Sequence, residues 1–298
     1  MKLVIGGCRG AHPVVQQGFF NYGGDTTSFH VQGAHGDNLL IDVGTGVRVL
    51  GAGLQAEKGS KKLLVLMTHY HLDHILGLPS LGLLHDPSWH VTFAAPTLKG
   101  HRVGSVLPRL LKAPFWPLQV EDLAAKIDFK TLEGSTSKRA ISWGKLRIRW
   151  CPVHHPGGCT AYRIEEDGHA LVVATDVEWA LSTPAQRKAL HALCAEPTPA
   201  DLLVMDGQYD TRSYPGHENW GHSTWQECVA LAQAAGVGRL VITHHGPSDD
   251  DGLLDRKAAA IQAAWGQADL ARSNDTYTLL PPPKPGKPAK SPAKPKTT

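Results

Sequence analysis

Leu63-Leu64-Val65-Leu66-Met67-Thr68-His69-Tyr70-His71-Leu72-Asp73-His74 is an apolar run that ends in a cluster of metal-binding side chains. Its first five residues predict a strand buried on both faces, and the apolar spacing after His74 predicts the start of a helix. Side chains alternate along an extended chain, so His69 and His71 point the same way and can bind one ion. Asp73 and His74, at the helix start, are directed toward a second position. Imidazole and carboxylate suit zinc, and also iron or manganese.

A purely structural interpretation of this stretch is three ordinary loop histidines and an N-cap aspartate. Four potential ligands stand within six residues, from His69 to His74. Such crowding of donors and charge serves no structural end, because each group would have to be desolvated near the others. The sequence therefore favours a metal site over a set of loop residues.

Three later predicted strands also end in potential ligands. Strand 146–153 ends at His154-His155, strand 170–174 at Thr175-Asp176, and strand 239–243 at His244-His245. A carboxylate can bind two metal ions, one on each oxygen, which a histidine cannot. The strand pattern alone does not choose between the two histidines of each pair.

The His-x-His-x-Asp-His pattern after a buried strand resembles the signature of the metallo-β-lactamase superfamily of binuclear metallohydrolases. Residues 9–13, 22–26 and the Asp42-x-Gly-x-Gly stretch resemble one branch of it, which groups phosphodiesterases, PhnP-type enzymes and ribonuclease Z. Ala11 and Asp25 depart from that branch, which more often has serine and asparagine there. The resemblance implies an α/β (α+β) fold, a four-layer αββα sandwich of two mixed β-sheets flanked by helices.

The same resemblance implies seven ligands for two ions. His155 is selected because it immediately precedes Pro-Gly-Gly, and His244 because it is the first histidine after the strand. The implied ligands are His69, His71 and His155 for the first ion, Asp73, His74 and His244 for the second, and Asp176 between them.

Three further residues are candidates for hydrogen bonding to the metal ligands and so orienting them. The resemblance gives this role to Asp42, because an aspartate stands at the matching place in the superfamily. His154 is either such a supporting residue or a core histidine. Glu178 is close enough in sequence to Asp176 to support it, although an acid at a helix start needs no such explanation.

His222 stands just before the predicted helix 225–235, for which Ser223 or Thr224 can act as the N-cap. The Gly-His-Ser-Thr string resembles the His-Ser-Thr motif of ribonuclease Z and its relatives. That resemblance implies that His222 faces the scissile phosphate and donates to it or to the leaving oxygen. The alternative is a solvated histidine beside a helix cap.

The resemblance implies a binuclear metal-dependent hydrolase, first of all a phosphodiesterase that acts through a metal-bridging hydroxide on a small or cyclic phosphodiester. Asp73 and His222 are the expected catalytic residues, and the cofactors are two divalent transition-metal ions, zinc before manganese or iron. Thioester or lactone hydrolysis of the glyoxalase II type uses the same ligands and is the main alternative. RNA cleavage of the ribonuclease Z kind is another. A binding protein with a degraded site is disfavoured, because no ligand position is missing.

At 298 residues, of which 42% are hydrophobic, the chain can bury one large core, which we expect in residues 1–280. Residues 281–298 are rich in proline and lysine and are expected to be disordered. Without the five lysines of this tail the net charge is about −2, which does not indicate a nucleic-acid surface. Residues 113–145 are either a lid over the site or a surface segment without a function.

The five cysteines form no Cys-x-x-Cys pair and are odd in number, which favours reduced thiols in a cytoplasmic protein. No stretch approaches the roughly twenty apolar residues of a membrane helix, so no membrane partner is expected. The expected partner is a small phosphodiester substrate, and nucleic acid is less favoured. The sequence does not decide whether the protein forms a homodimer.

Overall fold

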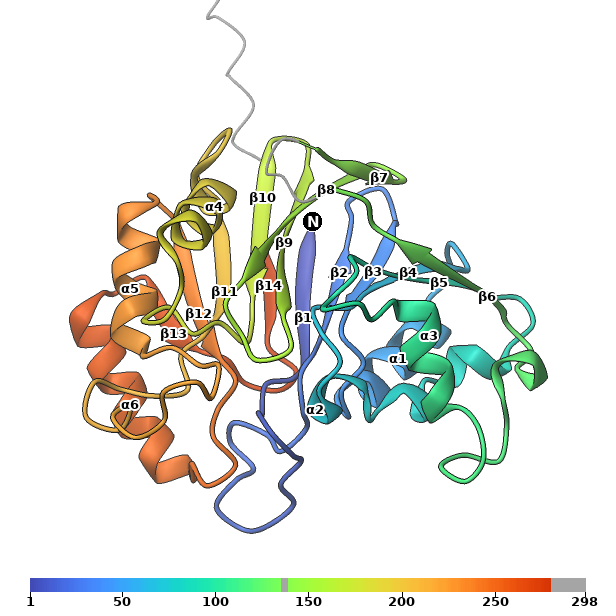
Figure 1. Ribbon diagram of the computed structural model, residues 1–298, viewed down its shortest axis with the longest axis horizontal. Coiled ribbons are helices and arrows are strands. Elements are labelled where there is room, and N and C mark those ends of the chain that lie inside the picture. Colours follow the sequence, from blue (N-terminus) through green and yellow to red (C-terminus); the bar gives the residue numbers. More distant parts are fainter. Residues whose placement is uncertain (135–138, 280–298) are drawn as a thin grey trace, which may run out of the picture.

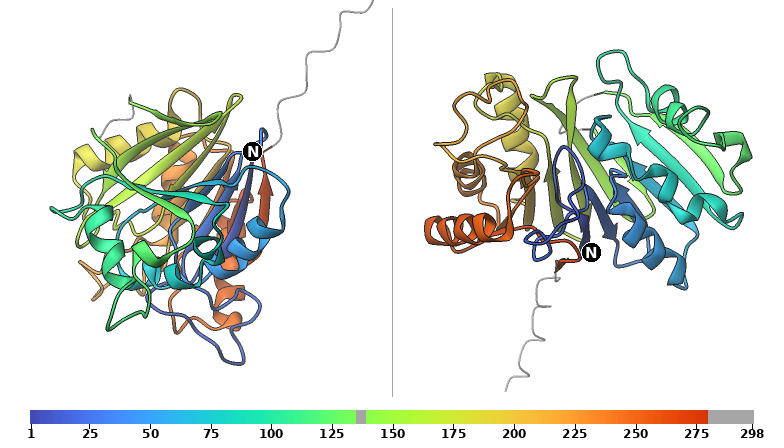
Figure 2. Two further views of the ribbon diagram at one scale, coloured as in Figure 1. Left: turned by 90° about the vertical axis from the view of Figure 1, so that its right-hand side faces the viewer. Right: turned by 90° about the horizontal axis from the view of Figure 1, so that it is seen from below.

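The computed structural model describes residues 1–134 and 139–279 (Figure 1). Two seven-stranded β-sheets pack face to face, and helices cover the outer face of each sheet (Figure 2). The predicted αββα sandwich of two mixed sheets is therefore confirmed.

The first sheet combines the N-terminal strands with the last strand of the chain, in the order β14-β1-β2-β3-β4-β5-β6. β3 to β6 are parallel, and the other pairs are antiparallel. Its strands are β1 (Lys2–Gly7), β2 (Ser28–Gln32), β3 (Asn38–Ile41), β4 (Lys62–Leu66), β5 (His90–Ala95), β6 (Lys126–Thr131) and β14 (Thr276–Thr278). Its helices are α1 (Val47–Ala56), α2 (Leu72–Ile75) and α3 (Val103–Leu110), with 3-10 turns at Leu78–Ser80, Gly82–His85 and Val120–Asp122.

The second sheet has the order β13-β12-β11-β10-β9-β8-β7. Its strands are β7 (Ile141–Trp143), β8 (Leu146–Val153), β9 (Cys159–Glu166), β10 (His169–Ala174), β11 (Leu202–Asp206), β12 (Arg239–Thr243) and β13 (Ala268–Leu270). Its helices are α4 (Pro184–Ala195), α5 (Trp225–Ala234) and α6 (Asp251–Ala264). β10 to β13 are parallel, and β7 to β10 are antiparallel.

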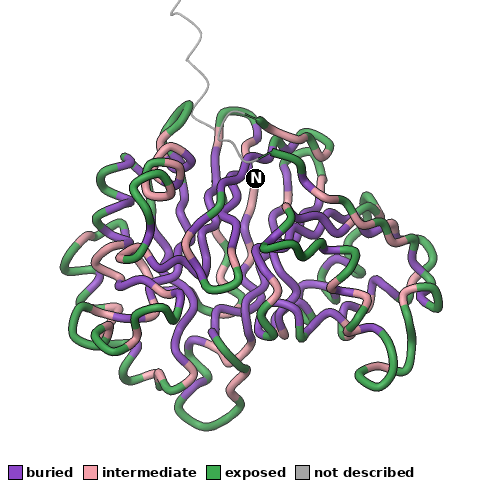
Figure 3. Tube along the Cα trace, viewed as in Figure 1, coloured by how far each residue is buried: buried purple, intermediate pink, exposed green. Residues whose placement is uncertain are grey.

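Three hydrophobic layers hold the sandwich together. The middle layer lies between the sheets and includes Phe29, Leu64, Trp150 and Leu171. One outer layer packs the first sheet against α1 and α3, and the other packs the second sheet against α4, α5 and α6. The central strands of both sheets are therefore buried on both faces, and exposure is concentrated in edge strands, helices and loops (Figure 3). This explains why the central strands are continuous apolar runs.

The strand directions bring the predicted ligands to one edge. β10, β11 and β12 are parallel, so their carboxyl ends meet at the same edge of the second sheet. β8 runs in the same direction, because it and β10 are each antiparallel to β9. β4 supplies the ligand turn from the first sheet, and α2 after it lies against that edge (Figure 1).

The spacing of apolar residues predicts a helix over residues 97–112, with a break at Pro108, and another over residues 253–270, and both have different bounds in the structure. The helix expected over 97–112 begins only at Val103, because Lys99 and Gly100 have φ of 46° and 87° and form a tight turn in which Leu98 pairs with His101. Pro108 does not interrupt α3, which ends two residues later. The helix expected over 253–270 ends at Ala264, since residues 268–270 alternate in burial and pair with β12 as a parallel edge strand.

Residues 113–145 contribute an edge strand to each sheet, β6 to the first and β7 to the second. That contribution was not predicted, and a lid role for the remaining loop stays a prediction. The proline- and lysine-rich tail lies outside the described residues. All five cysteines are buried and free. Among the described residues, no helix is long and apolar enough to cross a membrane.

The middle layer predicts a clear stability effect. Leu171 is fully buried between the sheets, so Leu171→Ala should lower the free energy of unfolding by roughly 2–5 kcal/mol through lost burial and a cavity. Val49→Ala on the exposed side of α1 is the control and should change it by less than about 0.5 kcal/mol. Urea unfolding measures both, and equal effects would refute this description of the core.

Candidate metal centre

One group of donor atoms consists of three histidines. His69 and His71 follow β4, and His155 follows β8. Nε2 of His155 lies 3.1 Å from Nδ1 of His71. One ring nitrogen from each of the three histidines lies within 4.8 Å of a ring nitrogen of the other two. His71 is exposed whereas His69 and His155 are buried, so the group opens toward solvent at His71.

A second group combines two aspartates and two histidines: Asp73, His74, Asp176 and His244. Nε2 of His74 lies 3.1 Å from Oδ2 of Asp176 and 3.4 Å from Oδ2 of Asp73. Nε2 of His244 lies 3.2 Å from Oδ1 of Asp176 and 3.2 Å from Oδ2 of Asp73. All four side chains are buried.

Asp176 joins the two groups. Besides its contacts in the second group, its Oδ1 lies 3.8 Å from Nε2 of His69 and 3.9 Å from Nε2 of His155. Donor atoms bonded at 2.0–2.1 Å to one tetrahedral ion are about 3.3 Å apart. The separations around Asp176 are close to that value, as expected if its carboxylate faces both positions.

Burial and neighbouring charge set the protonation of the histidines differently in the two groups. Burial lowers the pKa of His155 to about 4 and holds that of His69 well below its usual value. Burial also opposes charge on His74 and His244, but Asp176 and the other nearby carboxylates raise the pKa of both. Neutral imidazole is the form that binds metal, so the lowered pKa values of His69 and His155 favour the form that can bind an ion. In the second group, the positive charge of an ion would replace that of the protons on His74 and His244, which balances the charge of the nearby carboxylates.

Asp42 lies directly behind this cluster, as its predicted supporting role requires. Its Oδ2 accepts a hydrogen bond from Nδ1 of His74 at 2.7 Å and from the Thr68 hydroxyl at 2.6 Å. Its Oδ1 accepts from the Thr68 amide at 2.7 Å. These contacts hold the His74 ring with Nε2 toward Asp176 and fix the turn before His69.

Glu178 supports His155 through the backbone of the loop before α5. Its buried carboxylate accepts from the Tyr214 hydroxyl at 2.7 Å and from the amides of Asn219 and Gly221 at 2.7 and 2.9 Å. The Gly221 carbonyl in turn accepts from Nδ1 of His155 at 2.9 Å. Gly221 has φ of 94°, and a Cβ there would lie 2.0 Å from the His155 ring, so this approach requires glycine.

The N-terminal loop closes the site around the second group. The Ala11 amide donates to Oδ2 of Asp73 at 2.9 Å. A Cβ at Gly10 would lie 2.3 Å from the His244 ring, so glycine permits the contact. This loop, which the sequence linked to one branch of a superfamily, therefore lies against two predicted ligands.

His222 lies beside both donor groups. Its ring stacks on His244 with centroids 4.6 Å apart and lies 5.7 Å from the His155 ring. Its Nδ1 is 2.8 Å from Oδ2 of Asp206, and Asp206, His222 and His244 form a third set of clustered donors. Thr224, rather than Ser223, is the N-cap of α5.

Sequence reasoning assigned no role to Asp206 or Gln208. Asp206 ends β11 as Asp176 follows β10, so the position of an acid at the end of a buried strand was the available signal. Oε1 of Gln208 accepts from Nδ1 of His244 at 3.1 Å, which orients that ring. No comparable pattern marks Gln208 in the sequence.

In each pair of adjacent histidines, 154–155 and 244–245, the histidine that was not selected as a ligand lies outside the cluster. Nε2 of His245 donates to the Ala271 carbonyl at 2.8 Å, away from the donor groups. His154 contributes its backbone carbonyl, which accepts from the Glu178 amide at 2.9 Å. Within the described residues its side chain is not among the grouped donors, so its supporting role stays a prediction.

Three residues of the cluster adopt left-handed backbone conformations. The φ angles of Asp42, Asp176 and His244 are 59°, 56° and 63°. Such conformations cost roughly 1–3 kcal/mol each in residues other than glycine and are concentrated at functional sites. Here each one turns the chain one or two residues after a strand ends. Asp176 and His244 enter the cluster there, and Asp42 holds His74 from behind it.

The residues present fit divalent metal ions. Nε2 of His69 is buried and makes no hydrogen bond to any described residue, although the ring is packed among three other histidines. A buried polar atom without a partner is costly, and an ion would satisfy it. The mixture of imidazole and carboxylate donors suits zinc, manganese or iron.

The comparisons with known proteins agree with this geometry. The family described as a Beta-lactamase superfamily domain matches residues 37–245. Ribonuclease Z of Mycobacterium bovis (strain BCG / Pasteur 1173P2) is 30% identical over 256 residues, which cover 81% of this chain and 87% of the relative.

Two solved structures share the fold. A diphosphatase from the PhnP family has a TM-score of 0.68 at 19% identity, over 94% of this chain and 98% of the other. The metallo-beta-lactamase fold protein YhfI from Bacillus subtilis has a TM-score of 0.65 at 18% identity, over 93% and 99%.

Adjacent histidines provide a matched test of the centre. We expect about two transition-metal ions per chain after reconstitution, and His155→Ala should lose at least one of them because it removes a donor from the first group. His154→Ala removes the neighbouring histidine and should keep both. Elemental analysis of the purified variants measures this. Equal metal content in the two variants would contradict the assignment of His155.

Proposed function

Because the chain belongs to the metallo-β-lactamase superfamily, we propose that it is a binuclear metal-dependent hydrolase that cleaves phosphodiesters. The observation that supports this proposal most strongly is that Asp176 lies within 3.9 Å of histidine nitrogens from both donor groups. A histidine paired with a carboxylate, His222, lies beside both groups. The relatives named above include a ribonuclease and a diphosphatase, which supports phosphate chemistry.

Seven residues would hold the ions in this proposal: His69, His71, Asp73, His74, His155, Asp176 and His244. Two bound divalent ions would lower the pKa of water and would stabilise negative charge that develops on a phosphoryl group. Zinc is our first choice, with manganese and iron as alternatives, because imidazoles outnumber carboxylates among the donors. Asp73 acts both as a ligand and as the acceptor of the Ala11 amide, which orients it toward the second position.

His222 is the proposed general acid. Its Nδ1 donates to Asp206, which fixes the orientation of the ring. The opposite nitrogen, Nε2, is then the atom that can pass a proton to the leaving oxygen. The His222 side chain is 12% exposed, so it is accessible to substrate, whereas the Asp206 side chain is fully buried. Asp206 thus positions His222 and does not contact substrate.

A cavity next to the first donor group is the proposed substrate pocket. It has a volume of about 270 Å³, and His69 and His71 form part of its wall. Leu98 and Val106 line it with apolar surface, and Arg109 of α3 lines it with a positive charge. Such a pocket suits an anionic diester with an apolar leaving group. Within the described part of the chain, no carboxylate pairs with Arg109.

RNA cleavage of the ribonuclease Z kind is the second candidate, because the curated relative at 30% identity is a ribonuclease Z. Parallel turnover measurements on bis-p-nitrophenyl phosphate, a cyclic nucleotide, a thioester and a precursor tRNA distinguish the candidates. We expect the phosphodiesters to be cleaved and the thioester to be spared. Turnover of the thioester alone would refute the proposal and favour the glyoxalase II type of reaction.

His222→Ala should lower kcat for a phosphodiester with a poor leaving group by about 10²–10⁴-fold, the usual contribution of general acid catalysis. The loss should be smaller for bis-p-nitrophenyl phosphate, because p-nitrophenolate needs little protonation as it leaves. Metal content and KM should change little, since the proposed role is limited to the transition state.

His217→Ala is the control for this experiment, because His217 lies in the same loop but outside the donor groups. It should retain near-wild-type kcat. If His222→Ala cleaves good and poor leaving groups with undiminished kcat, the proposed acid role is wrong.

Arg109→Gln should raise KM for bis-p-nitrophenyl phosphate by about two- to fivefold, the range expected for loss of one exposed charge contact. Lys112→Gln removes a charge just beyond the same helix, from a residue that does not line the cavity, and should leave KM unchanged. Steady-state kinetics of the two variants measure the effect. Equal KM values for both variants would show that Arg109 does not contact substrate.

A further inference from the structure

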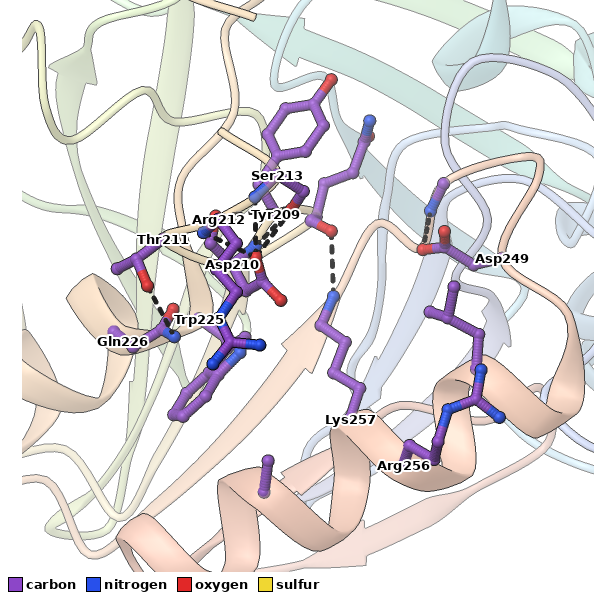
Figure 4. Close-up of a pocket in the computed structure, with 14 residues that line it drawn as sticks. Tyr209, Asp210, Thr211, Arg212, Ser213, Trp225, Gln226, Asp249, Arg256 and Lys257 are labelled. Carbon is purple, nitrogen blue, oxygen red and sulfur yellow. Dashed lines mark hydrogen bonds between the residues drawn. The ribbon is translucent and has the colours of Figure 1, made fainter. Parts of the chain in front are cut away.

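A second cavity, larger than the proposed substrate pocket, lies beside α6 and shares no lining residue with that pocket. It has a volume of about 750 Å³, and we call it the α6 pocket (Figure 4). It is bounded by the loop Gln208–Ser213 after β11, by the start of α5 and by one side of α6. Its volume is within the range of 300–1,000 Å³ typical of small-molecule sites. None of the seven proposed metal ligands lines it.

Positive charge in the α6 pocket is incompletely neutralised. Arg212 and Arg256 both line it, both are exposed, and within the described residues neither forms an ion pair with a carboxylate. Lys257 extends from α6 toward the loop after β11, with Arg212 on one side and Arg256 on the other (Figure 4). Its Nζ donates to the carbonyls of Gly207 and Gln208 at 2.7 and 3.0 Å. An ammonium group has three donors, so these bonds leave one for a ligand.

The two carboxylates of the pocket are already engaged by backbone amides. Oδ1 of Asp210 accepts from the amides of Arg212 and Ser213, each at 2.8 Å. Oδ2 of Asp249 accepts from the Gly246 amide at 2.9 Å. These bonds fix the two loops and direct the acids to the backbone. The guanidinium groups therefore remain available to an added anion.

The pocket also has an aromatic wall. Trp225, the first residue of α5, lines it beside Arg212 (Figure 4). Aromatic side chains next to guanidinium groups bind flat heterocycles that carry phosphate, because stacking and charge pairing act on neighbouring parts of the ligand. The Thr211 hydroxyl adds a hydrogen-bonding group at the same loop.

We propose that the α6 pocket binds a mononucleotide, with its phosphate on Arg212, Arg256 and Lys257 and its base against Trp225. This site is separate from the metal centre and does not depend on the function proposed for it. The two are connected through Gln208, which lines the pocket and accepts the hydrogen bond from His244.

The test is a calorimetric titration of the full-length, metal-loaded protein with adenosine 5′-monophosphate, with adenosine as the uncharged comparison. We expect saturable binding of the monophosphate and at least tenfold weaker binding of adenosine. The double variant Arg212→Gln/Arg256→Gln should weaken monophosphate binding at least tenfold. The control Arg48→Gln/Lys58→Gln removes two charges at α1 and should bind as the wild type does.

Trp225→Leu provides an independent variant, which should weaken binding of the monophosphate but not of inorganic phosphate. Unchanged circular dichroism and Tm verify that each variant is folded. The proposal is overturned if the wild type shows no saturable binding at millimolar concentration. It is also overturned if the arginine variant and the control bind equally, or if metal removal alone abolishes binding.

Discussion

The Asp176 carboxylate has oxygen atoms within 3.9 Å of histidine nitrogens from both sets of donors, and the rest of the site depends on its position. It comes from the second sheet, whereas His69, His71, Asp73 and His74 follow β4 of the first. The two sheets must therefore pack with these strand ends at a common edge. Without a bound ion this edge concentrates buried imidazoles and carboxylates, which costs desolvation energy. Metal binding would offset that cost, so fold and centre would stabilise each other.

Carboxylates at strand ends also organise the surroundings of the donors. Asp42 follows β3 and holds His74, and Asp206 ends β11 and holds His222. Glu178, two residues after Asp176, holds the loop that carries Gly221 and thereby His155. The supporting acids are buried, so these contacts are well screened from water and fix the orientation of each ring. The left-handed turns at Asp42, Asp176 and His244 are consistent with a site whose geometry overrides local backbone preference.

The sandwich and the set of clustered donors were expected from the family resemblance, which rests on short-range patterns: apolar runs that end in acids or histidines. His155 was chosen over His154, and His244 over His245, by family resemblance. The strand pattern alone allowed either histidine of a pair to be the ligand. Asp206 and Gln208 were not identified because their partners, His222 and His244, are distant in sequence. β13 was taken for helix, because its three residues carry too little periodicity to distinguish an edge strand. The α6 pocket joins loops and helices whose approach no local pattern encodes.

The central claim is that one carboxylate, that of Asp176, serves two metal ions. Anomalous X-ray diffraction from crystals of the metal-loaded protein tests it most directly, because the signal locates each ion independently of the protein coordinates. Two peaks are expected, roughly 3.5–4 Å apart, one beside His69, His71 and His155, the other beside Asp73, His74 and His244, with Asp176 in contact with both. A single peak, or two peaks of which Asp176 contacts only one, would contradict the claim.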